Sequence, residues 1–189
     1  MQLGNDIIDL KIDSEIRDRF VDRILHPEER ARYPGIENDD LLIWSLWAAK
    51  ESAYKAYRQA NMRYFLPNRW NVDLEASRVQ FETQSWDLAL HRSEDAIWAT
   101  SMSASTLAAS GYKIVSEMRS GTSELSPKEQ NELGRAILQD LLKEHGLEAV
   151  LQKDEHQIPR LHFKDQLLPF SMSHHGRHVF VCLGVPLHS

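Results

Sequence analysis

Cysteine, long hydrophobic runs and clustered positive charge are what this 189-residue chain has little of. Its single cysteine, Cys182, excludes an internal disulfide and a zinc site built from several cysteines. No run of residues reaches the roughly 18 apolar positions that a membrane-spanning helix needs. The net charge of -6, without any Lys/Arg block, argues against a general nucleic-acid-binding protein. The start, MQLGNDIIDL, has acidic residues where a signal peptide needs an apolar run, so we expect a cytoplasmic protein.

The composition is that of a globular protein with room for a sizeable core. Hydrophobic residues make up 42% of the chain and charged residues 26%, which is ordinary for globular domains. A chain of 189 residues allows one domain or two small ones. Composition selects no class of function, so the function must be sought in particular side chains.

The central segment of the sequence is residues 41–57, LLIWSLWAAKESAYKAY. It has the length of a globular helix and is apolar on nearly every side, which predicts a buried helix. Three charges interrupt it, Lys50, Glu51 and Lys55. Helical periodicity places Glu51 and Lys55 on the same face as two tryptophans, where a charge is costly unless it has a partner. Either they form an ordinary i,i+4 ion pair, or the helix presents a carboxylate and a cation to a phosphate-bearing ligand.

Hydrophobic patterning predicts the elements on either side of this helix. The other expected helices cover residues 15–25, residues 27–33, and a segment that follows the capping box Ser126-Pro127-Lys128-Glu129 and stops near His145-Gly146. The expected strands cover residues 2–10, 71–75, 79–82, 86–91, 96–103, 112–118, 147–152, 159–163, 168–174 and 179–183. Residues 119–125, RSGTSEL, read as a linker.

A short internal echo indicates two similar halves. Ser101-Met102-Ser103, a turn and an apolar strand are matched later by Ser171-Met172-Ser173, a turn and an apolar strand. With a helix and several strands in each part, the pattern predicts an α+β fold of two pseudo-symmetric halves joined near residue 122. We expect each half to be a small antiparallel sheet packed with a long helix.

Three carboxylates and three cations are the candidates for chemistry. Asp6 interrupts a buried-looking strand, Asp9 follows it, and Glu51 lies on the central helix. Carboxylates without cysteine or paired histidines suit a hard ion such as Mg²⁺ better than zinc. The cations expected beside them are Lys50, Lys55 and His174. Such cations neutralise phosphate oxygens, so the set predicts a phosphate ligand.

A second cluster, formed by His174, His175 and His178, allows two interpretations. Three histidines in a turn between strands can hold a transition metal such as zinc or nickel. They can also form a polar turn. The sequence places no strong partner ligand beside them, so both interpretations stay open.

Three motifs resemble the signatures of the 4'-phosphopantetheinyl transferases. The first is Gly4-Asn5-Asp6-Ile7-Ile8-Asp9, which is similar to the Gly-x-Asp strand of that family. The second, Lys50-Glu51-Ser52-Ala53-Tyr54-Lys55, is similar to its Lys-Glu helix. The third, Ser171-Met172-Ser173-His174, is similar to its Ser-x-Ser-His strand. Residues 19–33, RFVDRILHPEERARY, also resemble the bacterial holo-acyl-carrier-protein synthases.

The resemblance implies a particular arrangement of the chain. Residues 1–118 resemble the C-terminal half of the two-half, surfactin-synthetase-activating type of the family, and residues 123–189 resemble part of its N-terminal half. The halves would then be permuted. The family fold implied is α+β, with two halves about a pseudo-twofold axis and coenzyme A in the cleft between them.

The activity implied by the resemblance is transfer of 4'-phosphopantetheine from coenzyme A to a serine of an acyl or peptidyl carrier protein, with release of 3',5'-ADP. On this reading Asp6 and Glu51 hold Mg²⁺ against the pyrophosphate, and Asp9 helps directly or through water. Glu51 and Lys55 are the catalytic candidates. Glu51 would accept the serine proton, and Lys55 would neutralise the phosphate or the leaving group.

The resemblance also implies residues that hold coenzyme A. His174 would bind one of its phosphates, the 3'-phosphate being expected, with Ser173 beside it, and Lys50 would contribute a charge. One departure concerns the Gly-Lys-Pro that often precedes the Ser-x-Ser-His strand, whose lysine helps to hold the coenzyme. Here the stretch is Gln157-Ile158-Pro159, so Arg160 or Arg177 would have to supply the missing charge.

The expected partner is a carrier protein, and two other functions also fit the sequence. Arg17, Arg19 and Arg23 on the second expected element would face an acidic carrier protein, or would form an ordinary solvated helix face. Two other functions remain open: a non-catalytic relative that binds coenzyme A or a carrier protein, and a metal-dependent pyrophosphate hydrolase. The pathway served, whether fatty-acid, polyketide or nonribosomal peptide synthesis, is left open by the sequence.

Overall fold

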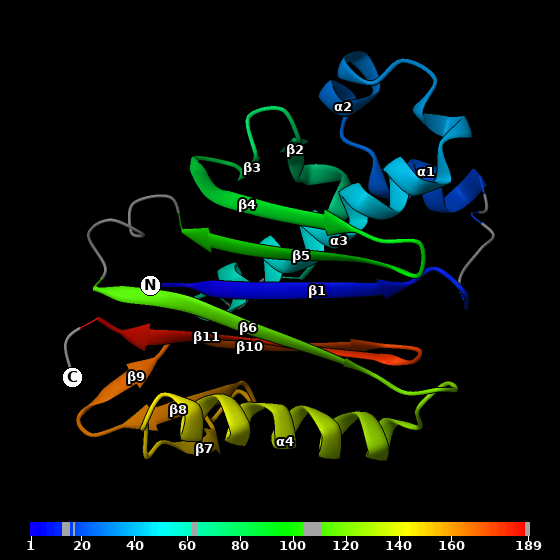
Figure 1. The fold of residues 1–189 in the computed structure, drawn as a ribbon. Coiled ribbons are helices and arrows are strands. Elements are labelled where there is room, and N and C mark those ends of the chain that lie inside the picture. The colour runs from blue at the N-terminus through cyan, green and yellow to red at the C-terminus, as the bar shows by residue number, and fades with distance from the viewer. Residues whose placement is uncertain (13–15, 17, 62–63, 104–110, 188–189) are drawn as a thin grey trace.

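The computed structural model describes residues 1–12, 16, 18–61, 64–103 and 111–187 (Figure 1). Its helices are α1 Asp18–Ile24, α2 Pro27–Arg32, α3 Asp40–Arg58 and α4 Pro127–Glu144, with 3-10 turns at Ile36–Asn38 and Pro67–Arg69. Its strands are β1 Leu3–Asp9, β2 Asn71–Asp73, β3 Arg78–Phe81, β4 Gln84–Arg92, β5 Ala96–Ser103, β6 Tyr112–Ser120, β7 Val150–Lys153, β8 Pro159–Phe163, β9 Gln166–Leu168, β10 Phe170–His175 and β11 His178–Pro186.

The described strands form three antiparallel sheets, which confirms the α+β class expected from the sequence. The first sheet has the order β1-β5-β4-β3-β2, and α3 packs on it through a core that includes Ala49, Ala53 and Trp86. The second has the order β10-β11-β6, and α4 packs on it through a core that includes Ile137 and Val181. The third, β7-β8-β9, adjoins this second core. Each long helix therefore has its own sheet and its own core (Figure 1).

Strand β6 joins the sheet that its place in the sequence does not suggest. The sequence predicts that residues 112–118 belong to the first half, but β6 pairs along its whole length with β11. Its apolar side chains point both ways: Ile114 and Met118 pack against β1 and β5, whereas Val115 packs on the core of α4. Alternation of apolar and polar residues predicts a strand but not which strand it pairs with. The sequence therefore could not show that β6 pairs with β11. The pseudo-symmetry of the halves stays a prediction.

Strand β1 and helix α3 pack so closely at Gly4 that their backbones are in contact. A Cβ atom added at Gly4 would lie 2.0 Å from the carbonyl oxygen of Ser52 and 2.5 Å from the amide nitrogen of Ala56. A strand side chain of any size would therefore push the helix away. Since side chains two positions apart share a face of a strand, the face that touches α3 at Gly4 also presents Asp6 to it.

Along the edge of β1 that does not pair with β5, backbone amides donate to side chains and not to the backbone of another strand. The amide of Asn5 donates to Ser171 Oγ at 3.0 Å, and the amide of Asp9 donates to His175 Nδ1 at 2.9 Å. At the other end, Gln59 Oε1 accepts from the amide of Leu3 at 3.3 Å. Strand β10 therefore lies beside β1 without a backbone ladder (Figure 1). Side chains therefore connect the two strands, and pockets open between the two sheets.

Most predicted elements agree with the structure to within a few residues. The capping box at Ser126 and Glu129 is formed and starts α4 as expected. The expected strand at residues 147–152 starts later, as β7, and the expected strand at 168–174 is divided into β9 and β10 at Pro169. Proline has no amide hydrogen to donate to a ladder, which explains the break. Within the described residues, no helix is long and apolar enough to cross a membrane.

Replacement of Gly4 by alanine should destabilise the fold strongly. The new methyl group would overlap the α3 backbone, so we expect the free energy of unfolding to fall by about 3 kcal/mol or more. Gly35→Ala is the matched control, because Gly35 has a φ of +82° but nothing within 4 Å of an added Cβ. Its cost should be about 1–2 kcal/mol. Urea unfolding followed by tryptophan fluorescence measures both, and equal costs would contradict the close contact.

Candidate active site between the two sheets

A pocket of about 410 Å³ opens between α3, β1 and the end of β10. Its polar lining consists of Asp6, Glu51, Lys55, His174 and His175. The apolar lining is a wall of Phe20, Trp44 and Trp47, in which the Phe20 ring packs at a tilt against both tryptophans, with Ile7 and Ile8. The structure thus brings together four of the predicted site residues, from three elements that are distant in sequence.

Asp6 and Lys55 form the ion pair of this pocket. Lys55 Nζ donates to Asp6 Oδ1 at 2.7 Å, and the lysine side chain keeps 32% of its surface exposed. Burial raises the pKa of Asp6 above its ordinary value, although the Lys55 ammonium acts against this. Of the two alternatives that the sequence left open, the ordinary i,i+4 ion pair with Glu51 is not formed, and Lys55 pairs across to β1 instead.

Glu51 is the second carboxylate of the pocket. Burial and then the negative charge of Asp6 raise the pKa of Glu51 to about 7, with Lys55 acting against them. Within the part of the chain that the structure describes, its carboxylate has no hydrogen-bond or ion-pair partner. An uncompensated carboxylate with a pKa near neutrality can take up a proton or a cation.

The two carboxylates would suit a magnesium ion whose remaining ligands come from elsewhere than the described protein side chains. Among the described residues, no group of three His, Cys, Asp or Glu side chains could hold a metal alone. Mg²⁺ is usually held by one or two carboxylates while phosphates and water supply its other ligands. Burial and then the negative charge of Asp6 raise the pKa of Glu51, and a cation bound by the two carboxylates would offset both effects.

His174 completes the polar lining from the β10 side. Burial, and then the positive charge of Lys55, lower the pKa of His174 below its ordinary value. The ring is therefore neutral at physiological pH and offers one N–H donor. A phosphate oxygen near it could accept that hydrogen bond.

Lys50 lies elsewhere, within the core. Its side chain is 0% exposed, and Nζ donates to Glu29 Oε2 at 2.6 Å and to the carbonyl oxygen of Ile24. Glu29 also accepts from the amides of Val72 and His26. Burial lowers the pKa of Lys50 to about 8, against the opposing charge of Glu29. The lysine that was expected to hold coenzyme A thus ties α3 to α2 and β2 instead.

Three further predicted residues lie outside the lining of this pocket. Ser173 is 2% exposed, and its Oγ has no hydrogen-bond partner among the described residues. Arg160 donates to Asp154 Oδ2 and to the carbonyl oxygen of Gln59, at the edge of a neighbouring pocket. Asp9 is fully buried at the end of β1, and its carboxylate is bound by Arg177. Sequence spacing could not show which way these side chains point.

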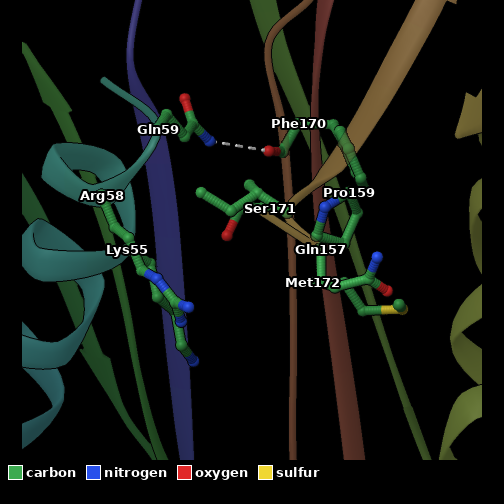
Figure 2. Close-up of a pocket in the computed structure, with 9 residues that line it drawn as sticks. Lys55, Arg58, Gln59, Gln157, Pro159, Phe170, Ser171 and Met172 are labelled. Carbon is green, nitrogen blue, oxygen red and sulfur yellow. Dashed lines mark hydrogen bonds between the residues drawn. The ribbon is translucent and has the colours of Figure 1, made fainter. Parts of the chain in front are cut away.

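A second pocket, of about 250 Å³, continues the site along α3 (Figure 2). Figure 2 shows Lys55 and Arg58 pointing from α3 toward it, opposite Gln157 and Met172. Arg58 is exposed, and its guanidinium has no ion pair or hydrogen bond within the described residues. Lys55 lines both pockets, so the two pockets adjoin at this side chain, and their linings together include two cations and two carboxylates.

Arg58 and Phe20 line the site but were not predicted from the sequence. Trp44 and Trp47, in contrast, do lie on the same face as Glu51 and Lys55, as the helical periodicity predicts. Arg58 lies one helical turn after Lys55, and this spacing was a usable signal. His175 was noted only as part of a histidine turn, whereas the structure places it in the pocket lining. Of the arginines expected to face a carrier protein, Arg19 and Arg23 are exposed on α1 beside Phe20, and Arg17 lies outside the described residues.

Comparison with known families decides the assignment. A family model described as the 4'-phosphopantetheinyl transferase superfamily matches residues 2–109, more than half of the chain. The chain belongs to this superfamily. The matched region contains Asp6, Glu51 and Lys55, and its members are transferases. No curated protein and no solved structure matches the chain. The superfamily assignment therefore rests on the half that carries the two carboxylates.

Neutralisation of Glu51 should stabilise the protein at high pH. Because folding raises its pKa from 4.5 to about 7, Glu51 contributes stability that is present below pH 4.5 and lost as the pH rises through 7. We expect Glu51→Gln to gain up to about 3 kcal/mol over the wild type between pH 4.5 and pH 8. Urea unfolding at both pH values measures this gain. Glu75→Gln, at an exposed turn, is the control, and a gain independent of pH would contradict the account.

Proposed function

We propose that this protein transfers 4'-phosphopantetheine from coenzyme A to a serine of an acyl or peptidyl carrier protein, in a Mg²⁺-dependent reaction. The observation that carries the proposal is the meeting of Asp6, Glu51, Lys55 and His174 around one pocket between the sheets. The superfamily match covers the half that supplies three of them. Together with the adjoining pocket, this pocket combines an uncompensated carboxylate with two cations, Lys55 and Arg58, which is the chemistry that a metal-bound pyrophosphate requires.

The coenzyme would lie along α3, across the two pockets that adjoin at Lys55. Lys55, at the junction of the two pockets, would neutralise the pyrophosphate, and His174 would donate its N–H to a phosphate oxygen. Arg58 would replace the missing Gly-Lys-Pro lysine, since it lines the pocket that Gln157 and Ile158 also line. Arg160, suggested above for this task, is already bound to Asp154.

Bound Mg²⁺, held by Asp6 and Glu51, would neutralise charge on the pyrophosphate oxygens. The serine hydroxyl of the carrier would attack the phosphorus that bears the pantetheine arm. A serine O–P bond forms, the bond from that phosphorus to the bridging oxygen breaks, and 3',5'-ADP leaves. Glu51 would take the serine proton directly or through water.

The carrier protein would approach over α1. Phe20 lines the pocket from this helix, and the exposed Arg19 and Arg23 flank it in sequence. An acidic carrier helix would meet these arginines, which raises the rate of encounter more than the affinity. The aromatic wall of Trp44 and Trp47 would shield the pantetheine arm from water.

Transfer is measured by mass spectrometry of a panel of apo carrier proteins incubated with this protein, coenzyme A and Mg²⁺. We expect one carrier to gain the mass of one phosphopantetheine group. Glu51→Gln should slow that gain at least about 100-fold, because proton acceptance and metal binding are both lost. Glu75→Gln, outside the pocket, is the matched control and should transfer at the wild-type rate.

The same assay separates the alternatives. Coenzyme A cleaved without modification of any carrier would support the pyrophosphate hydrolase. Coenzyme A bound but left intact with every carrier would support a binding-only relative. Either result would contradict the proposed transferase.

Arg58→Gln should weaken coenzyme A binding about tenfold, because one charge-assisted hydrogen bond is worth roughly 1.5–3 kcal/mol. Arg135→Gln, at an exposed position of α4, is the control and should bind as the wild type does. Ile158→Lys restores the family's lysine at the same pocket and should rescue binding in the Arg58→Gln background. Isothermal titration measures all three, and unchanged binding by Arg58→Gln would contradict the assignment of this cation.

A further inference from the structure

The carboxylate of Asp9 is fully occupied by hydrogen-bond donors. Arg177 donates to Oδ2 from Nε at 2.8 Å and from its own amide at 2.9 Å, and to Oδ1 from Nη2 at 2.7 Å. The amide of Lys11 also donates to Oδ1, at 3.0 Å. A carboxylate has about four lone-pair positions, and these four bonds use them. His178 Nε2 lies 3.7 Å from Oδ1 on the remaining side.

This arrangement leaves Asp9 without a lone pair for a metal ion. Burial alone would raise the pKa of Asp9, but the hydrogen bonds from Arg177 hold it well below its ordinary range. The side chain is 0% exposed and does not line the pocket of Asp6 and Glu51. Its charge is therefore balanced within the fold, in contrast to that of Glu51.

The bonds to Asp9 fix the turn between β10 and β11 against the end of β1. A Cβ at Gly176 would lie 2.6 Å from Asp9 Oδ2, so the turn backbone lies against the carboxylate itself. The other side of the turn is held from the first turns of α4, where Gln130 Nε2 donates to the carbonyl oxygen of Gly176. It is also held from the residue that follows β6, since the amide of Gly121 donates to the carbonyl oxygen of Arg177. The turn is thus held from both sides.

The same end of β1 sets the orientation of a pocket histidine. The amide of Asp9 donates to His175 Nδ1 at 2.9 Å, so a neutral His175 must carry its proton on Nε2. His174 and His175 both line the pocket opposite Asp6 and Glu51. They immediately precede the turn that Arg177 and Asp9 hold.

We propose that Asp9 and Arg177 form a clamp that positions His174 and His175 across from the metal-binding carboxylates, and that Asp9 is a positioning residue and not a metal ligand. The inference rests on the proposed function for its catalytic consequence. The contact between Asp9 and Arg177 can be tested without measuring the transfer reaction. It assigns to Asp9 a role different from the metal ligation that its place after the Gly-x-Asp motif suggested.

The test compares Asp9→Asn, Arg177→Gln and the double variant, with Glu51→Gln as the variant that removes a metal ligand. Binding of Mn²⁺, alone and with coenzyme A, is followed by electron paramagnetic resonance, and the ring resonances of His174 and His175 by NMR. Transfer to the carrier protein gives kcat. Arg177→Lys keeps the charge without the planar fork, and it serves if Arg177→Gln does not fold.

We expect Asp9→Asn and Arg177→Gln to bind Mn²⁺ within about twofold of the wild type, to shift the histidine resonances alike, and to lower kcat at least about tenfold. The double variant should equal either single variant, because both remove one interaction. Glu51→Gln should lose Mn²⁺ binding while leaving the ring resonances of His174 and His175 unchanged.

Two outcomes would overturn the clamp. One is loss of Mn²⁺ affinity in Asp9→Asn but not in Arg177→Gln, which would make Asp9 a ligand. The other is histidine resonances unchanged in both variants, which would remove the positioning role. If the wild type modifies no carrier protein, the proposed function fails, yet metal binding and the resonances still decide the question of the clamp.

Discussion

The backbone contact between β1 and α3 at Gly4 is the constraint on which the site depends. Because the strand touches the helix there, Asp6, two residues later on the same face, reaches Lys55 and lies within the electrostatic influence of Glu51. The opposite edge of β1 is satisfied by side chains of β10 and α3, so the second sheet approaches without pairing. One strand thus forms a wall of the pocket and joins the two sheets.

Charge is distributed unequally around this strand. The buried charges away from the pocket are balanced by direct partners, Lys50 by Glu29 and Asp9 by Arg177. In the pocket, Lys55 is shared between one carboxylate and a solvent-facing space, and Glu51 has no partner within the described residues. Ionisation of Glu51 therefore costs stability in the absence of a ligand, which is the usual property of a site built to bind one. In the part of the chain that the structure describes, charged side chains buried away from the pocket are thus paired, whereas the pocket keeps one carboxylate unpaired.

The sequence predicted the elements and the residue types of the site better than their contacts. Residues 41–57 were identified as a buried helix, because an apolar surface on all sides leaves no other stable place for it. Asp6, Glu51, Lys55 and His174 were named from motifs and do meet in one pocket. Lys50, Asp9 and the partner of β6 could not be placed, since each depends on which neighbour the folded chain supplies. Adjacent positions on a helix, such as Lys50 and Glu51, point about 100° apart and here face different environments.

The most direct test of the account is a crystal structure of the protein with coenzyme A and Mn²⁺, in which anomalous scattering locates the metal. We expect the metal to be bound by Asp6, Glu51 and the pyrophosphate, the coenzyme to run along α3 past Lys55 and Arg58, and Asp9 to remain bound to Arg177. A metal bound away from Glu51, or a coenzyme bound outside the pockets between the two sheets, would contradict it.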